Sequence, residues 1–157
     1  MNTILLTGEP GLMDAPLTYL ILAITIYTSY RMMENHYERD KFLFNPYTIK
    51  RNKEWYRFFS HGLIHANWMH LLFNAYVLYA FGAMVEMAFK LYVFGELLGP
   101  IMYLCLYVSG LLMSSMYSYY KHQDNPGYNA LGASGAVSSI VFTYILLAPT
   151  SGMGLIF

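Results

Sequence analysis

Four apolar stretches divide the chain, near residues 16–32, 68–89, 92–118 and 134–148. Each approaches the roughly 20 residues that a helix needs to cross a hydrocarbon core about 30 Å thick. A further apolar run begins at residues 152–157, where the sequence stops without a polar tail. The pattern predicts an all-α, polytopic membrane helix bundle with four transmembrane helices and the start of a fifth, incomplete at its C-terminal end.

A long polar connection, residues 31–60, separates the first two apolar stretches. It contains seven of the nine Lys and Arg residues and four acidic residues. Aromatic side chains alternate with these charges, which is typical of a folded element that lies among lipid headgroups. We therefore expect one membrane domain over residues 1–157, with residues 31–60 as an interfacial loop.

The composition supports a membrane protein and argues against a nucleic-acid-binding, a disulfide-bonded or a cysteine-metal protein. Hydrophobic residues make up 57% of the chain and charged residues only 11%, against about 25% charged in soluble domains. The nine basic and nine acidic residues cancel, so no basic field favours nucleic acid. The single cysteine, Cys105, excludes an internal disulfide and a cysteine metal cluster. We expect Cys105 to be a small packing residue and the lipid bilayer to be a partner.

Polar side chains crowd the stretch from His61 to Asn74, immediately before the apolar residues 75–83. Such groups are costly at the mouth of a membrane span, so by default they indicate a functional site. Asn67 is suited to cap the second helix. His70 and Asn74 are four residues apart and share a helical face. Glu86 lies near the end of the same span. We expect it to be an acid at a helix interface, where packing satisfies its carboxylate.

Each candidate group has a functional and a structural interpretation. Small residues at the start of the fourth apolar stretch predict that this helix approaches a neighbour closely. Ser134, between Gly132 and Gly135, could be a nucleophile at a helix start, although serine among small residues more often serves helix packing. His70 and Asn74 are donors of the type that stabilise an oxyanion, or they are satisfied polar groups at an interface.

Metal binding is a third interpretation of the histidines. His61, His65 and His70 have the spacing His-x3-His-x4-His, but no carboxylate or cysteine lies nearby in the sequence to complete a ligand shell. We therefore expect no metal and no other cofactor.

Taken together, these motifs resemble the rhomboid intramembrane serine proteases. The similar pattern is Arg57-Phe-Phe-Ser-His61-x3-His65-x4-His70-x3-Asn74, then Glu86, then Gly132-x-Ser134-Gly135. The resemblance implies a serine endopeptidase that cleaves transmembrane proteins by acyl transfer. It implies that Ser134 is the nucleophile and that His70 and Asn74 line the oxyanion hole beside the backbone N–H of Ser134. It also implies structural roles for four further residues: Arg57, His61, His65 and Glu86.

The chain departs from the family in two places. The characteristic Trp-Arg pair of the first loop is here Trp55-Tyr56-Arg57. The family takes its general base from a histidine on the sixth span, which lies beyond this sequence. None of His36, His61, His65 and His122 lies on a span that the family places opposite Ser134. We therefore expect residues 1–157 to be inactive alone, with a longer parent chain as the protease. The alternative is a non-catalytic rhomboid-like protein that binds membrane helices.

The resemblance also implies a location and a topology. We expect a multi-pass protein of a bacterial inner membrane, with the N-terminus inside, residues 31–60 outside and the site open to the outer side. The excess of Lys and Arg in residues 31–60 would instead favour the cytoplasm by the positive-inside rule. We follow the family topology because its site motifs are more specific than the charge pattern.

Overall fold

The structure, a computed structural model, describes residues 10–149. Within this range every regular element is helical, and the one β-type feature is an isolated bridge between Phe44 and Ala130. The elements are α1 (Pro16–Glu34), α2 (His36–Phe42), α3 (Pro46–Asn52), α4 (Arg57–Ser60), η2 (His61–Leu63), α5 (Trp68–Val77), η3 (Leu78–Gly82), α6 (Ala83–Ala88), η4 (Phe89–Val93), α7 (Gly95–His122) and α8 (Ser134–Leu147). The all-α prediction is confirmed.

Helices occur at all four expected places. The second is one continuous rod from α5 to η4, with π-helical turns at η3 and η4. It extends to Val93, and the third begins at Gly95 rather than Tyr92, because the chain reverses at Gly95 in a left-handed conformation (φ 82°) that glycine adopts without strain.

Two helices of the described range are long and apolar enough to cross a membrane by length and composition, Trp68–Val93 and Gly95–His122. The other two expected spans, α1 and α8, are not among them, and α8 is an apolar helix of only 14 residues.

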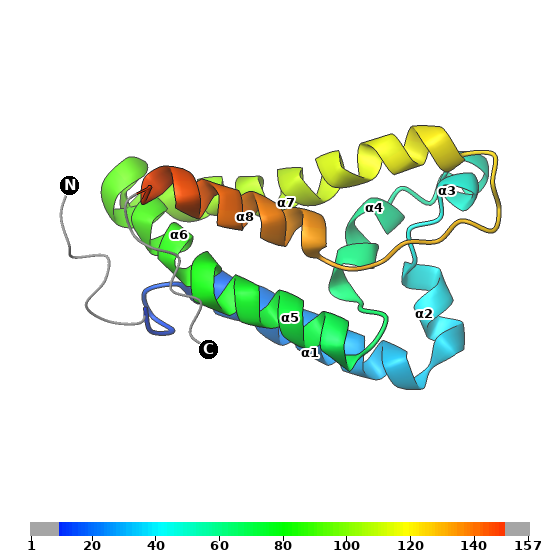
Figure 1. Ribbon diagram of the computed structural model, residues 1–157, viewed down its shortest axis with the longest axis horizontal. Coiled ribbons are helices and arrows are strands. Elements are labelled where there is room, and N and C mark those ends of the chain that lie inside the picture. The colour runs from blue at the N-terminus through cyan, green and yellow to red at the C-terminus, as the bar shows by residue number, and fades with distance from the viewer. Residues whose placement is uncertain (1–9, 150–157) are drawn as a thin grey trace.

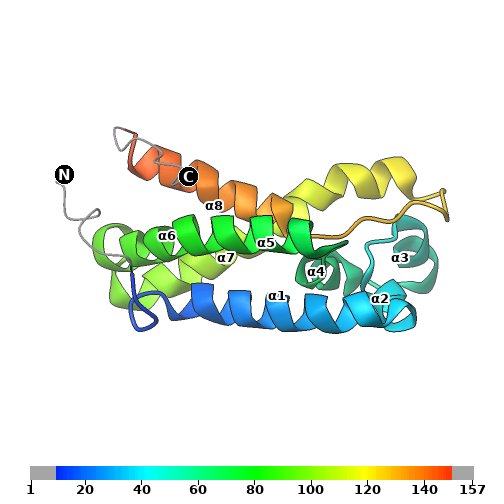
Figure 2. The same cartoon turned by 60° about the horizontal axis from the view of Figure 1, so that its bottom comes forward.

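The helices form two pairs that run along the bundle. Figures 1 and 2 show α1 beside α5, and α8 beside α7, with α2, α3 and α4 gathered at one end and α6 at the other. Small residues set the close approach of α7 and α8: a Cβ added at Gly135 would collide with the side chain of Ser114, and one added at Gly110 would lie 2.8 Å from the Cβ of Ser139. The prediction of close small-residue packing by the fourth helix is confirmed.

A carboxylate closes the bundle at the α6 end. Glu86 is fully buried, and its oxygens accept hydrogen bonds from the backbone N–H groups of Leu17 (3.0 Å) and Thr18 (2.7 Å) in the first turn of α1. The Thr18 hydroxyl also donates to Glu86 (2.7 Å), so it accepts from the hydroxyl of Tyr103 on α7 (2.7 Å). Glu86 therefore satisfies the free amides of α1 and joins three helices, as expected of an acid satisfied by packing.

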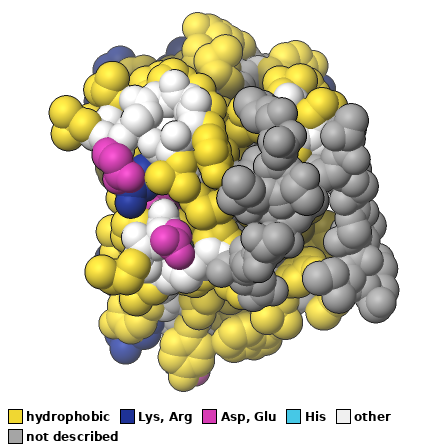
Figure 3. All heavy atoms as spheres, turned by 90° about the vertical axis from the view of Figure 1, so that its left-hand side faces the viewer, with side chains coloured by type: hydrophobic (Ala, Val, Ile, Leu, Met, Phe, Trp, Pro, Cys, Tyr) yellow, Lys and Arg dark blue, Asp and Glu magenta, His cyan; other side chains and the backbone are white. Residues whose placement is uncertain are grey.

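Apolar side chains also cover much of the outside. Figure 3 shows the α6 end of the molecule, where hydrophobic side chains dominate the described surface and few acidic or basic groups appear. Soluble proteins rarely expose contiguous apolar patches of this kind, whereas lipid accepts them. Cys105 belongs to the exposed surface of α7, so the expectation that it is a small packing residue was wrong. An apolar sequence neighbourhood does not reveal which helix face a residue occupies.

Candidate active site

The polar stretch before α5 folds as a short helical turn, an extended segment and a capped helix start. The side chain of Asn67 accepts a hydrogen bond from the backbone N–H of His70 (2.9 Å), so the predicted cap is confirmed. The buried side-chain amide of Asn74 donates to the carbonyl of His70 (2.9 Å), one turn earlier on the same face. One N–H of the Asn74 amide is then committed to its own helix, and the second is left for another acceptor.

Gly132 brings the segment before α8 against this face. Its φ of 112° is a left-handed conformation that favours glycine, and its N–H donates to the carbonyl of His61 (2.8 Å). A Cβ at this position would lie 2.6 Å from Cε1 of His70. The absence of a side chain at Gly132 therefore lets the His70 ring approach the backbone two residues before Ser134.

Ser134 is the first residue of α8 and is exposed. Its hydroxyl makes no hydrogen bond to any residue that the structure describes. The first turn of α8 closes with the bond from the N–H of Val137 to the carbonyl of Ala133 (2.9 Å), so the amides of Ser134 and the next two residues have no partner in the helix. A free hydroxyl thus stands beside free N–H donors at the positive end of a helix dipole.

His65 connects α1 to the segment before Ser134. Its Nε2 accepts from the N–H of Ala133 (3.4 Å), so Nδ1 carries the proton and donates to the hydroxyl of Ser29 (3.0 Å). Ser29 in turn donates to the carbonyl of Leu63 (3.1 Å). Burial, with a smaller effect from neighbouring His70, lowers the pKa of His65 to about 4. His65 is therefore neutral at physiological pH, with both ring nitrogens occupied.

His61 makes the corresponding connection to α7. Its Nε2 lies 3.1 Å from the hydroxyl of Ser115, and its ring packs against Phe44. Burial lowers the pKa of His61 to about 4, only partly offset by a hydrogen bond to the backbone of Phe58. His61 and His65 thus hold the polar stretch between α1 and α7, on either side of Gly132.

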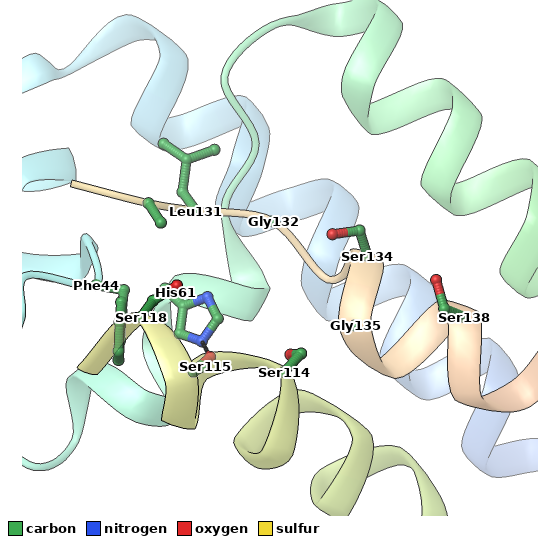
Figure 4. Close-up of a pocket in the computed structure, with 11 residues that line it drawn as sticks. Phe44, His61, Ser114, Ser115, Ser118, Leu131, Gly132, Ser134, Gly135 and Ser138 are labelled. Carbon is green, nitrogen blue, oxygen red and sulfur yellow. Dashed lines mark hydrogen bonds between the residues drawn. The ribbon is translucent and has the colours of Figure 1, made fainter. Parts of the chain in front are cut away.

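A cavity of about 240 Å³ opens beside the start of α8. Figure 4 shows Ser134 and Ser138 on one side of it, with Ser114 and Ser115 of α7 and the ring of His61 on the other. Ser118 adds a fifth hydroxyl to the lining. A space of this size and polarity can hold several hydrogen-bonded water molecules.

Not all of the residues singled out in the sequence come together. Among the described residues no hydrogen bond joins Ser134 to His70 or to Asn74. Glu86 lies 16 residues beyond His70, about 24 Å along the helix axis, and belongs to the other end of the bundle. No group of three His, Cys, Asp or Glu side chains in residues 10–149 is arranged to hold a metal ion.

Arg57 is buried within the connection between α1 and α5. It pairs with Glu54 (2.6 Å) and donates to the carbonyls of Asp40 and Leu43 (2.8 Å each). These contacts hold the turn after α2 against α4. Their effect is local, and none of them reaches Ser134 directly.

Sequence reasoning missed several residues that support the site, above all Ser29, Ser115 and Asn45. A signal existed for Ser29, because Thr18, Thr25 and Ser29 recur at helical spacing in the otherwise apolar first stretch and are all buried. A polar stripe inside an apolar helix predicts polar partners on the neighbouring helices. Asn45 gave no such signal, because it stands in a polar connection.

Comparison with known proteins identifies the family. A family profile described as Rhomboid domain matches residues 52–155, more than half of the chain. Comparisons with curated proteins and with solved structures gave no match. The matched residues contain the histidine stretch, both long apolar helices and the start of α8. The chain therefore belongs to the rhomboid family of intramembrane proteins.

Proposed function

We propose that this protein is an intramembrane serine endopeptidase in which Ser134 is the nucleophile. The observation that carries the proposal is the exposed hydroxyl of Ser134, which has no partner in the described residues and begins α8 beside unbonded N–H groups. Family membership supports the same reaction class. A serine that served only helix packing would be expected to be buried or bonded to its own helix.

The reaction is acyl transfer. The Ser134 oxygen attacks the carbonyl carbon of the scissile peptide bond while its proton passes to a general base, and the carbonyl oxygen becomes an oxyanion. The N–H of Ser134, the ring of His70 and the second N–H of Asn74 are the proposed donors to that oxyanion. One such donor typically contributes about 10²–10³ in rate. Collapse releases the amine, and water then hydrolyses the acyl-serine ester.

Transmembrane segments of other proteins are the proposed substrates. Peptide bonds in a regular helix are shielded and already hydrogen-bonded, so a substrate must unwind locally, which helix-breaking residues favour. Hydrolysis inside a bilayer also needs water at the nucleophile. The hydroxyl-lined cavity beside Ser134 suits that need.

The general base is the part that these residues do not supply. None of the five histidines is hydrogen-bonded to Ser134, and His61 and His65 have their ring nitrogens engaged elsewhere. We propose that residues 1–157 alone do not cleave and that a histidine outside them completes the site. Cleavage of a transmembrane substrate by the purified 157-residue chain would contradict this part of the proposal.

The decisive experiment compares Ser134 with Ser138, the matched hydroxyl one turn along α8. A form of the protein extended to include a further histidine-bearing span is reconstituted with a transmembrane reporter. Ser134→Ala is expected to abolish cleavage and labelling by a fluorophosphonate, while Ser138→Ala keeps both. Equal activity of Ser134→Ala and the parent would exclude Ser134 as the nucleophile.

A second candidate is a non-catalytic protein that binds membrane helices. The observation in its favour is the lack of any histidine hydrogen-bonded to Ser134. Two measurements distinguish the two functions. A binding protein captures the reporter helix equally well in the parent form and in the Ser134→Ala variant. It also never reacts with the fluorophosphonate.

Membrane placement belongs to the same proposal. We place residues 31–60 in the headgroup layer as part of a single rhomboid-like domain, on the outer side of a bacterial inner membrane. The test is a Cys105→Ser background, needed because Cys105 is exposed, with one cysteine introduced at exposed Lys50. Labelling of intact cells by an impermeant maleimide is expected. Labelling only after lysis would reverse the topology.

A further inference from the structure

We propose that Asn45 is a positioning residue, which holds residues 126–133 in place and through them Ser134. The inference rests on the proposed function for its catalytic meaning, but the contact itself can be measured without it. Asn45 lies in the turn between α2 and α3, about 90 residues before the serine. No candidate motif included it.

The side chain of Asn45 uses its acceptor and both donor hydrogens. Its oxygen accepts from the N–H of Thr48 (2.8 Å) and so caps α3. Its amide nitrogen donates to the carbonyl of Pro126 (3.1 Å) and to the side-chain oxygen of Asn129 (3.0 Å). Asn45 is 8% exposed, so its side chain is buried although Pro126 and Asn129 are exposed.

The backbone beside Asn45 makes a second connection. The N–H of Phe44 donates to the carbonyl of Ala130 (2.9 Å), and the N–H of Ala130 donates back to Phe44 (3.0 Å). Further along, Gly132 bonds to His61 and Ala133 to His65. The chain is thus held at successive points from Pro126 to the residue before Ser134.

Tyr128 anchors the middle of this segment: it packs against the buried cluster that contains Phe44, stacks on His122 (3.8 Å between ring centroids) and bonds through its hydroxyl to Ser118 (3.2 Å). Few other forces hold its neighbours. Pro126, Gly127 and Asn129 are exposed, so little apolar burial fixes them. The ion pair of Lys50 on α3 with Asp124 (2.9 Å) lies nearby, but both side chains are exposed, and such pairs contribute little. The bonds of Asn45 are therefore the main restraint on Pro126 and Asn129.

Asparagine is the side chain that fits this arrangement. Aspartate would keep the oxygen that caps α3 but would present a carboxylate oxygen to the carbonyl of Pro126 and the side-chain oxygen of Asn129. Asn45→Asp consequently separates the two roles of the residue: the cap remains, and the connection to residues 126–129 is lost.

The test measures amide hydrogen exchange of the 157-residue chain in phospholipid nanodiscs. In Asn45→Asp, exchange of the amides of residues 130–133 is expected to rise about tenfold, since two hydrogen bonds are lost. The matched control is Asn35→Asp, the same change at the cap of α2, whose exposed side chain accepts a hydrogen bond from the N–H of Glu38 (3.2 Å). Exchange at 130–133 is expected to be unchanged there.

A second variant covers the case in which Asn45→Asp does not fold. Asn129→Ala removes one acceptor of the Asn45 amide from the exposed side and is expected to raise exchange at 130–133 about threefold. Unchanged exchange at these amides in the folded Asn45 variant, or in Asn129→Ala where only that variant folds, would overturn the proposal.

Cleavage by the extended form then separates positioning from general stability. Asn45→Asp is expected to lower kcat about tenfold while KM stays within about twofold, because the substrate surface is intact and the nucleophile is displaced. Raised exchange with an unchanged kcat would overturn the positioning role. If the unsubstituted protein cleaves nothing, the proposed protease function fails, and the exchange result alone decides whether Asn45 holds the segment.

Discussion

Two regions of the bundle differ in whether their polar side chains are hydrogen-bonded. At the α6 end, Glu86 is fully buried and accepts three hydrogen bonds from Leu17 and Thr18. At the start of α8, Ser134 is exposed, and its hydroxyl has no partner among residues 10–149. Both residues stand out as polar groups in apolar helices, and the sequence alone does not rank them.

The difference shows how to distinguish a structural polar group from a reactive one. A buried carboxylate persists only when its acceptor capacity is filled, and then it has nothing left to react with. A nucleophile needs the opposite arrangement: its oxygen is accessible, and the groups that position it do not occupy that oxygen with hydrogen bonds. His61 and His65 are intermediate: they are bonded themselves, and they hold the segment that presents Ser134.

Loss of the Ser134 hydroxyl should have the largest effect of all, and the effect should be on cleavage. Ser134→Ala is expected to lower cleavage by the extended form at least about 10³-fold, while the free energy of unfolding changes by less than about 0.5 kcal/mol, as for most exposed substitutions. Reporter cleavage and unfolding in mixed micelles would measure both. A strongly destabilised variant would show that Ser134 also serves packing, which would weaken the contrast.

Substitution of the buried, hydrogen-bonded Glu86 should instead lower the free energy of unfolding. Glu86→Gln places an amide group among the donors of Leu17 and Thr18, and it is expected to cost about 2–3 kcal/mol of unfolding free energy. The control is Glu96→Gln, which removes an exposed partner of Lys90 (3.2 Å) and should cost less than about 0.5 kcal/mol. Equal costs for the two variants would refute the buried network.

The lowered pKa values of His61 and His65 predict that the free energy of unfolding depends on pH. In the unfolded chain they titrate near a pKa of 6.5, and in the folded chain the pKa of each is lowered to about 4. Between these values the unfolded state binds more protons, so stability is complete above pH 6.5 and is lost as the pH falls toward 4.

Lowering the pH from 7.5 to 6 should therefore remove about 1–2 kcal/mol for the pair. Denaturant unfolding at several pH values would measure the slope. His65→Gln should reduce the slope by about half, because His61 still contributes, and exposed His36→Gln should leave it unchanged. A slope that is the same in all three proteins would assign the pH dependence to other groups.

The smallest expected difference compares two buried tyrosines of α7. Tyr103→Phe removes the hydrogen bond to Thr18 (2.7 Å) and should cost about 1 kcal/mol. The Tyr107 hydroxyl is buried without a partner in the described residues, so Tyr107→Phe should be neutral or stabilising. Thermal unfolding of both variants is the measurement. A cost at Tyr107 equal to that at Tyr103 would indicate an additional partner, such as water, for Tyr107.

Local signals in the sequence predicted much of the fold. The four helices, the Asn67 cap and the close approach of α8 through small residues were all expected from neighbouring residues. The end of the second helix was placed too early, because Lys90 interrupts the apolar run there and Gly95 was not interpreted as the reversal point.

The candidate site was predictable only in part. Ser134, His70 and Asn74 stood out by residue type and by resemblance to a family, and their catalytic roles stay predictions. The structure added the cavity and the contacts of Ser29, Ser115 and Asn45. Those contacts have no local signature, because each partner lies tens of residues away in the chain.

The sequence by itself determined where helices form, since hydrophobic length, caps and small residues act between near neighbours. Only the tertiary structure decided which polar groups are satisfied. The bonds that satisfy Glu86 and His65 and hold the segment before Ser134 join residues 36 to 86 positions apart. Hydrogen bonds need partners within about 3 Å, and that proximity exists only after the helices have packed.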